Sequence, residues 1–425
     1  MATPHRIPFS PGHAFGLPGT IAINIARARR PVKSESGIRP ALRGITAAAW
    51  AHRTGDKLPP SAYPSSIFGL RGAGHLYRCC PMSYSALPDK SFWRRCLESE
   101  DFHLRGIYTP RFLIGPDAPV VTAGSCFAQK IGHELRASSA RFLDFEPVPQ
   151  GLTAATAAQL GFGLFSARFG NIYSTTQLLQ LAEDAFADRL RDEAFWHKDG
   201  RWFDGLRPRL EPGGFASRDL ARRARRAHLA QVRRMFLEAE VFIFTLGLTE
   251  RWEDDRTGTV YPLCPAVVDP AFADPAHRFH NARMAEVVAD LDRTLTLLQM
   301  MNPDLRVLFT VSPVPLMATA TGDHVLAATA RSKAVLRAAV DEICHLHPST
   351  DYFPSYEIAT QNPRRRDAFG PDQREVRPEV VETIMDVFFA AQTGLTRRVA
   401  AKGPTDDEAA AAELCDEILL AAART

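Results

Sequence analysis

The sequence predicts an α/β fold built around a parallel β-sheet. Residues 241–246 and 305–311 are short, continuously apolar runs, a pattern typical of strands that are buried on both faces. Between them, residues 281–301 place apolar side chains at helical spacing, and Asn302-Pro303 ends that helix. Because a strand, a helix and a strand of these lengths form a βαβ unit, the sheet is expected to be parallel with a right-handed crossover.

A third strand leads into the stretch that we expect to carry the chemistry. Residues 120–122 are Val-Val-Thr, the small-residue turn 123–126 is Ala-Gly-Ser-Cys, and apolar residues then recur at helical spacing. This order places the Ser125 hydroxyl and the Cys126 thiol at a helix N-terminus, where the dipole favours an alkoxide, a thiolate or a bound oxyanion. The alternative is that Ser125 only caps the helix, a common structural role of serine.

The remaining segments complete the α/β pattern. Periodicity predicts further helices over residues 154–165, 176–186, 218–240, 332–344 and 378–389, and short strands near residues 142 and 352. Residues 196–214 contain Trp and Arg and are expected to form a packed surface loop. In a parallel sheet the loops at the carboxyl ends of the strands gather at one edge, so those after the three buried strands should converge.

Charge divides the chain into two unlike parts. Residues 1–81 hold eleven Lys/Arg against two acidic residues, whereas the rest of the chain holds 40 basic and 46 acidic residues. We expect residues 1–81 to be a disordered basic extension, 82–392 the globular domain, beginning near Met82, and 393–425 a helical tail. A basic extension also fits a nucleic-acid or membrane tether, but we expect no nucleic-acid partner and leave the oligomeric state open.

Cysteine usage and the scattered histidines exclude several classes of site. The seven cysteines are odd in number and form no C-x-x-C pair, which argues against a disulfide scaffold and a thiolate zinc site and favours the cytoplasm. No apolar run approaches the ~20 residues of a membrane span. The sequence shows no metal-ligand cluster and no Gly-rich phosphate loop, so we expect neither a metal nor a cofactor.

Residues 124–128, Gly-Ser-Cys-Phe-Ala, match the signature of the GSCFA family, which resembles a divergent branch of the SGNH (GDSL-type) hydrolases. Other blocks of the family follow in order within residues 83–390, namely RFGNIY at 168–173, FTLGLTE at 244–250, TVSPVP at 310–315 and YFPSYEI at 352–358. The resemblance implies a three-layer α/β/α sandwich. It also implies hydrolysis or transfer of an acyl group on a small-molecule or carbohydrate ester.

The resemblance also implies roles for individual residues, with two candidates for the nucleophile. A gapless match to the Gly-Asp-Ser of SGNH enzymes puts Cys126 at the serine, whereas a shift of one residue makes it Ser125. We favour Ser125 because the wider group uses serine. Thr249 stands where that group has an Asn donor, and Asn171 is a possible substitute. The predicted oxyanion and substrate residues are Gly124, Asn171, Gly247, Thr249, Glu250, Ser312 and Glu357.

The general base is harder to place. SGNH enzymes carry Asp-x-x-His near the C-terminus, and the corresponding positions here are Asp372 and Glu375. A carboxylate does not replace an imidazole unless its pKa is raised. His324 follows the third strand loop and is therefore the candidate base, with Lys333 or Glu357 orienting its partners. The alternative is a protein that has lost catalysis and binds a carbohydrate or acyl ligand.

Overall fold

The structure is a computed structural model that describes residues 84–98, 104, 106–363 and 367–397. The predicted extension over residues 1–81 and the predicted tail helix around residues 406–423 lie outside the described residues.

Five parallel strands form the central sheet, in the spatial order β10–β9–β5–β1–β2. They are β1 (Pro119–Gly124), β2 (Arg141–Phe142), β5 (Val241–Leu246), β9 (Arg306–Val311) and β10 (Thr350–Tyr352). The register pairs Gly124 with Thr245, and Leu246 with Val311. The carboxyl ends of the three neighbouring strands β1, β5 and β9 therefore lie at nearly the same level, which confirms the parallel arrangement expected from the βαβ pattern.

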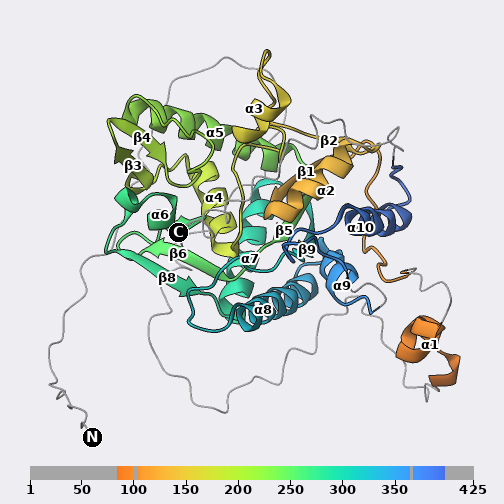
Figure 1. Ribbon diagram of the computed structural model, residues 1–425. Coiled ribbons are helices and arrows are strands. Elements are labelled where there is room, and N and C mark those ends of the chain that lie inside the picture. Colours follow the sequence, from red (N-terminus) through yellow and green to blue (C-terminus); the bar gives the residue numbers. More distant parts are fainter. Residues whose placement is uncertain (1–83, 99–103, 105, 364–366, 398–425) are drawn as a thin grey trace, which may run out of the picture. The chain divides into compact units, whose positions relative to one another are not determined.

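Helices cover both faces of this sheet (Figure 1). One face packs against α4 (Thr175–Ala187), α5 (Arg218–Glu238), α7 (Met284–Met301) and α8 (Val325–Leu346). The other packs against α2 (Cys126–Arg136), α9 (Ser355–Thr360) and α10 (Pro378–Ala391). Strand β5 shows the alternation, since Phe242 and Phe244 belong to the first core and Val241 and Ile243 to the second. The three-layer α/β/α class is confirmed.

Two small antiparallel sheets lie outside the central one. Strands β3 (Phe195–Lys198) and β4 (Arg201–Asp204) form a hairpin, and the second sheet contains β6 (Glu250–Asp254), β7 (Val260–Tyr261) and β8 (His277–Asn281). The expectation of a surface loop over residues 196–214 is therefore wrong at its start. Trp196 anchors the hairpin because its ring lies 5.4 Å from that of Tyr261 and 4.7 Å from that of Phe272.

Two helices differ in length from the prediction. Helix α3 (Ala154–Gln159) stops early because Gly161 and Gly163 adopt positive φ of 73° and 69°. Helix α8 starts earlier than expected because His324 caps it, with Nδ1 accepting the Leu326 N–H at 3.2 Å. The other described helices are α1 (Trp93–Glu98), α6 (Pro265–Val268) and four short 3₁₀ turns.

Candidate functional site

The turn between β1 and α2 presents Ser125 without using its side chain. Ser125 occupies the N-cap of α2 in an extended conformation, and its N–H donates to the Thr245 carbonyl at 3.1 Å. Its side chain makes no capping hydrogen bond. Ser174 and Ser217, at the N-caps of α4 and α5, each accept an N–H from three residues along. The capping role that is the alternative for Ser125 is therefore not realised.

The Ser125 hydroxyl is also buried. The residue is 2% exposed, and its Oγ has no hydrogen-bond partner among the described residues. An unpaired buried hydroxyl costs on the order of 1–3 kcal/mol, so such groups are uncommon and each needs an explanation. A nucleophile that awaits its substrate is one such explanation.

Ser125 lies in a pocket at the carboxyl edge of the sheet, which we call the Ser125 pocket. The loops after β1, β5 and β9 converge there, as expected for a parallel sheet. The space inside, including its open side, is about 220 Å³. The lining residues are Ser125, Cys126, Tyr173, Gly247, Leu248, Ser312, Val314, Pro315, Leu316 and Lys333.

Gly247 is the contact point between the loops. A Cβ on this residue would lie 3.1 Å from the Ser125 Cβ and 3.0 Å from the Tyr173 carbonyl oxygen, so the site needs glycine for close approach. Its N–H donates to the Tyr173 carbonyl at 3.2 Å, and its own carbonyl accepts from Lys333 Nζ at 2.6 Å. Because the Gly247 N–H is engaged, the amides that begin α2 are better placed for a developing negative charge.

Thr249 and Glu250 lie on the same loop but outside the residues that line the Ser125 pocket. Thr249 donates its hydroxyl to Asn281 Oδ1 at 2.7 Å and its N–H to Ser332 Oγ at 3.0 Å. Glu250 accepts the Thr319 hydroxyl at 2.6 Å, and burial raises the pKa of its carboxyl group. These contacts join β6 to α8 and to the loop after β9, so both residues support the pocket wall in this structure.

Ser312 and the loop that follows it form the opposite wall. The Ser312 N–H donates to Leu246 O at 2.8 Å, and its Oγ accepts the Val314 N–H at 3.3 Å. The Arg374 guanidinium donates to the Pro315 carbonyl from Nη2 at 3.1 Å. The segment before α10 is thereby tied to the edge of the pocket.

Asn171 lies beside the strand that ends at Gly124 rather than in the Ser125 pocket. It is 1% exposed, its Oδ1 accepts from Gln129 Nε2 at 3.0 Å, and its carbonyl accepts from Gln177 Nε2 at 2.9 Å. The following N–H, that of Ile172, donates to Gly124 O at 2.8 Å. Asn171 thus positions the backbone next to the Gly124 turn, and it also lines a separate small pocket.

The predicted base and its partner both lie on the surface. His324 is exposed and caps α8, and Asp372 is exposed and accepts the Arg374 and Glu375 N–H groups, each at 3.0 Å. Those two N–H bonds lower the pKa of Asp372. Glu375 forms an ion pair of 3.5 Å with Lys130. None of His324, Asp372 and Glu375 is among the described residues that line the Ser125 pocket.

Glu357, the remaining predicted site residue, holds two elements together. Its carboxylate accepts from Arg337 Nε at 2.8 Å and from the Tyr352 hydroxyl at 2.7 Å, while the Arg337 guanidinium lies 4.2 Å above the Tyr352 ring. Burial and the nearby Glu357 raise the pKa of Tyr352 far above its ordinary value. Glu357 is likewise absent from the lining of the Ser125 pocket.

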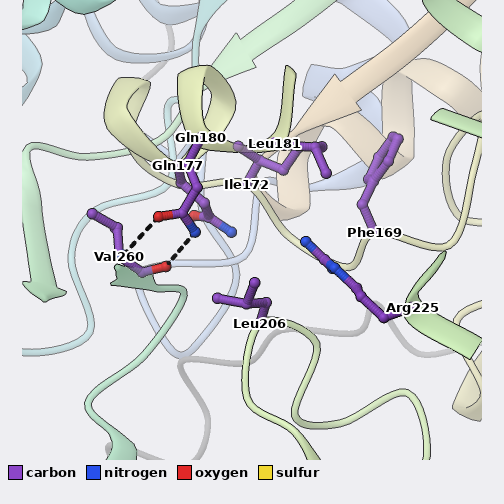
Figure 2. A pocket seen from close by; sticks show the side chains of 8 residues that line it. All are labelled: Phe169, Ile172, Gln177, Gln180, Leu181, Leu206, Arg225 and Val260. Carbon is purple, nitrogen blue, oxygen red and sulfur yellow. Dashed lines mark hydrogen bonds between the residues drawn. The ribbon is translucent and has the colours of Figure 1, made fainter. Parts of the chain in front are cut away.

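A second pocket lies between α4, α5 and β7. Figure 2 shows its eight lining side chains, with the Arg225 guanidinium turned toward the others. Both polar atoms of the Gln180 side chain are hydrogen-bonded there. Nε2 donates to the Val260 carbonyl at 3.0 Å, and Oε1 accepts the Val260 N–H at 2.9 Å. Arg225 is 5% exposed and lies 3.8 Å from Asp204. Burial lowers the pKa of Arg225, and the Asp204 charge opposes this shift.

A histidine–carboxylate pair lies on the same side of the sheet as the second pocket, with His228 buried and Glu146 half-buried. His228 Nδ1 is 2.7 Å from Glu146 Oε2, which also accepts the Arg168 N–H at 2.6 Å. Burial, and then the charge of Arg207, lower the pKa of His228 to about 4 although Glu146 opposes them. His228 is therefore neutral at pH 7 and is structural in character.

The sequence did not indicate several of the pocket residues. Tyr173, Leu248 and Val314 carry a signal only as members of the RFGNIY, FTLGLTE and TVSPVP blocks. Leu316 lies outside every block, in a loop without periodicity, so no pattern distinguishes it. The sequence predicts Lys333 as an orienting residue, but no pattern in it places the amine beside Ser125.

The described part of the chain lacks two further features. Within residues 84–98, 104, 106–363 and 367–397, no three His, Cys, Asp or Glu side chains are grouped so as to hold a metal ion. In that same part, no helix has the length and apolar character needed to cross a membrane.

Comparison with known proteins identifies a family and shows a weak structural similarity. The profile of the GSCFA family matches residues 119–388, which is more than half of the chain. No curated protein matches. A solved structure of a carbohydrate esterase family 2 enzyme plus carbohydrate-binding domain, from Corynascus thermopiles (Myceliophthora fergusii), is 14% identical, with a TM-score of 0.21. The similarity covers 36% of this chain and 38% of that one.

Proposed function

Because this chain belongs to the GSCFA family, we propose that it hydrolyses or transfers an acyl group by forming an ester between that group and Ser125. The observation that carries the proposal is the Ser125 hydroxyl itself. It is buried, it lacks a hydrogen-bond partner among the described residues, and it lies at the start of α2 inside a pocket. No other described N-cap serine of a long helix combines these properties, since Ser174 and Ser217 both cap.

The proposed reaction has two steps. Ser125 Oγ attacks the acyl carbonyl carbon, its proton passes to a general base, and the carbonyl electron pair moves to oxygen. The N-terminal amides and dipole of α2 favour that oxyanion. When the electron pair returns, the bond to the alcohol oxygen breaks and the base gives its proton to the leaving alcohol. Water or a second alcohol then removes the acyl group from Ser125 in the same manner.

The pocket favours a short acyl group. Its space of about 220 Å³ includes the open side, and its walls include the apolar residues Leu248, Val314 and Leu316. A long acyl chain has no room in so small a space, so we propose acetyl, the smallest of the common acyl groups. An acylated carbohydrate as the ester follows only from the resemblance to SGNH hydrolases.

Cys126 is the alternative nucleophile, because it lines the same pocket and follows Ser125 directly. Its thiol would react by the same route through a thioester. Ser125 is preferred because its Oγ is buried without a hydrogen-bond partner among the described residues.

Hydrolysis of p-nitrophenyl acetate tests the proposal. We expect Ser125→Ala to lose kcat by at least about 1,000-fold with the fold intact, on the scale of removing a serine nucleophile. Ser217→Ala, which removes a capping serine, is the matched control and should keep its activity. A comparable loss in Cys126→Ala with an active Ser125→Ala would move the nucleophile to Cys126.

A binding protein is the second candidate function, and one observation favours it. None of the described residues that line the Ser125 pocket is a histidine, and Glu375 stands where the resemblance expects one. In that case the wild-type protein turns over no acyl ester, yet acetylated oligosaccharides bind and Leu316→Trp, which fills the pocket, abolishes their binding.

The cysteines bear on where the protein works. The described cysteines, Cys96, Cys126, Cys264 and Cys344, are all free thiols. We therefore propose a reducing compartment such as the cytoplasm.

A further inference from the structure

Lys333 occupies an uncommon position for a lysine. It lies on α8 and is 2% exposed, on the helix face that continues to Leu336 and Val340 in the core. Lysine is almost never fully buried unless a polar partner holds its amine. Here Nζ donates to the Gly247 carbonyl oxygen at 2.6 Å, which fixes the amine inside the Ser125 pocket.

Gly247 brings Lys333 and Ser125 together. The Ser125 Cβ lies 3.1 Å from the place where a Gly247 Cβ would be, and Lys333 Nζ contacts the carbonyl of the same residue. Both side chains line the pocket. Ser125 Oγ has no hydrogen bond to another described residue, so rotation about Cα–Cβ can carry it between staggered positions without breaking one.

Among the described lining residues, Lys333 is the one whose side chain carries a nitrogen base. The other polar side chains there are hydroxyls and one thiol, belonging to Ser125, Ser312, Tyr173 and Cys126. The pocket therefore contains a nucleophile and a base, and the base is an amine.

We propose that Lys333 is the general base for Ser125, which makes the site a serine–lysine pair. This inference rests on the proposed acyl chemistry. The uncharged Lys333 amine takes the Ser125 Oγ proton as Oγ bonds to the acyl carbon, and the carbonyl electron pair moves to oxygen. When that pair returns, the bond to the leaving alcohol breaks, and the Lys333 ammonium gives its proton to the alcohol oxygen. Water then repeats the sequence on the acyl-enzyme, and Lys333 again accepts and returns one proton.

The bond to Gly247 fits this role. An uncharged amine keeps two N–H groups, so it can still donate to the Gly247 carbonyl while its lone pair faces Ser125. The same bond limits the freedom of a long side chain, and positioning of this kind is a large part of general-base efficiency.

Three substitutions at Lys333 separate basicity from charge and packing. Lys333→Arg keeps a cation and a donor for Gly247 but has no available lone pair. Lys333→Met keeps most of the side-chain volume, and Lys333→Ala opens space for a small amine. The control is Lys198→Met, which removes the ion pair between Lys198, at the end of β3, and Asp269.

We expect both Lys333→Arg and Lys333→Met to lose kcat for p-nitrophenyl acetate by about 100-fold or more with KM nearly unchanged. Methylamine and ethylamine should restore turnover to Lys333→Ala, and more basic amines should restore more per uncharged molecule. A purely structural lysine does not give this dependence on amine basicity. If Lys333→Ala does not fold, the Arg and Met variants decide the question by themselves.

Two results overturn the inference while leaving the proposed function intact. One is a Lys333→Arg or Lys333→Met variant that keeps wild-type kcat. The other is a folded Lys333→Ala variant whose turnover no amine restores. An inactive His324→Ala variant would then point to His324 as the base. Failure of the proposed function itself looks different, because the wild-type protein then shows neither turnover nor covalent labelling of Ser125.

Discussion

Gly124 and Thr245 approach so closely that a Cβ on Gly124 would lie 2.3 Å from the Thr245 carbonyl oxygen. Gly124 also has a φ of 139°, which side chains rarely allow. The contact brings β1 against β5 one residue before Ser125, the proposed nucleophile. The glycine of the signature therefore sets the position of Ser125 relative to the neighbouring strand.

Gly124→Ala should consequently destabilise the fold strongly. Backbone strain and overpacking against a strand act together, and we expect the free energy of unfolding to fall by about 3 kcal/mol or more. Urea denaturation measures this. Gly170→Ala is the control, since its φ is 72° but a Cβ there meets nothing within 4 Å. Its cost should be about 1–2 kcal/mol, and equal costs for both variants would show that the contact with Thr245 is not decisive.

Leu316→Ala should change the preferred length of the acyl chain. Leu316 is 4% exposed and lines the Ser125 pocket, so removing its side chain lengthens the space available to the acyl group. We expect the ratio of kcat/KM for p-nitrophenyl butyrate to that for the acetate to rise several-fold. Leu326→Ala, at a residue that is 71% exposed, should leave the ratio at its wild-type value. An unchanged ratio in Leu316→Ala would place the acyl group elsewhere.

His228 should make stability fall in acid. Its pKa is about 4 in the folded protein, mainly because of burial, against 6.5 in the unfolded chain. The unfolded state therefore binds more protons between these values, and the free energy of unfolding rises with pH from about 4 to 6.5. The contribution is about 3 kcal/mol and is fully present above pH 6.5. Between pH 4 and 6.5 the free energy of unfolding should depend less on pH in His228→Gln than in the wild-type protein. Parallel pH profiles for the two proteins would contradict the assignment of this slope to His228.

Glu146, the hydrogen-bond partner of His228, affects stability at lower pH. Burial would raise the pKa of Glu146, but the contacts with His228, Arg207 and the Arg168 N–H lower it to about 2. The stability that depends on ionised Glu146 is thus lost as pH falls from 4.5 towards 2. His228→Gln should therefore remove the pH dependence of the unfolding free energy between pH 4 and 6.5. It should leave the separate loss of stability below that range, which belongs to Glu146.

Asp204 should contribute strongly to stability through the buried charges beside the second pocket. Its carboxylate accepts from Arg207 Nε at 2.9 Å and lies 3.8 Å from Arg225, and all three side chains are nearly fully buried. Asp204→Ala leaves two buried guanidinium groups without this counter-charge, which should cost about 3–5 kcal/mol of unfolding free energy. Asp255→Ala breaks an exposed pair with Arg278 and should cost less than about 1 kcal/mol. Similar costs in urea denaturation would contradict the role of burial.

The strands and the nucleophile turn could be predicted because their signals are local. Residues 241–246 form β5 with the expected bounds, and the Ala-Gly-Ser-Cys turn joins a strand to a helix as its small residues indicate. The sheet of β6, β7 and β8 was not predicted, because half-buried, charged residues such as Glu250 and Arg251 give no apolar alternation.

The proposed base could not be predicted for a different reason. Lysine is normally an exposed residue, so nothing in the sequence indicates that Lys333 turns inward to reach the Gly247 carbonyl. That contact depends on the packing of α8 against the sheet, which brings together residues 86 positions apart. The sequence predicts His324 as the base because imidazole is the usual one, whereas in the structure its ring caps a helix at the surface.

Covalent labelling tests the central claim most directly. The intact wild-type protein is treated with a fluorophosphonate and, in a separate sample, with iodoacetamide, and the modified residues are mapped by mass spectrometry. We expect one fluorophosphonate adduct, on Ser125, which is absent after heat denaturation and blocked by an excess of a short acyl ester. A folded protein that carries no adduct on Ser125, or that is labelled by iodoacetamide on Cys126 with loss of esterase activity, would contradict the assignment of Ser125 as the nucleophile.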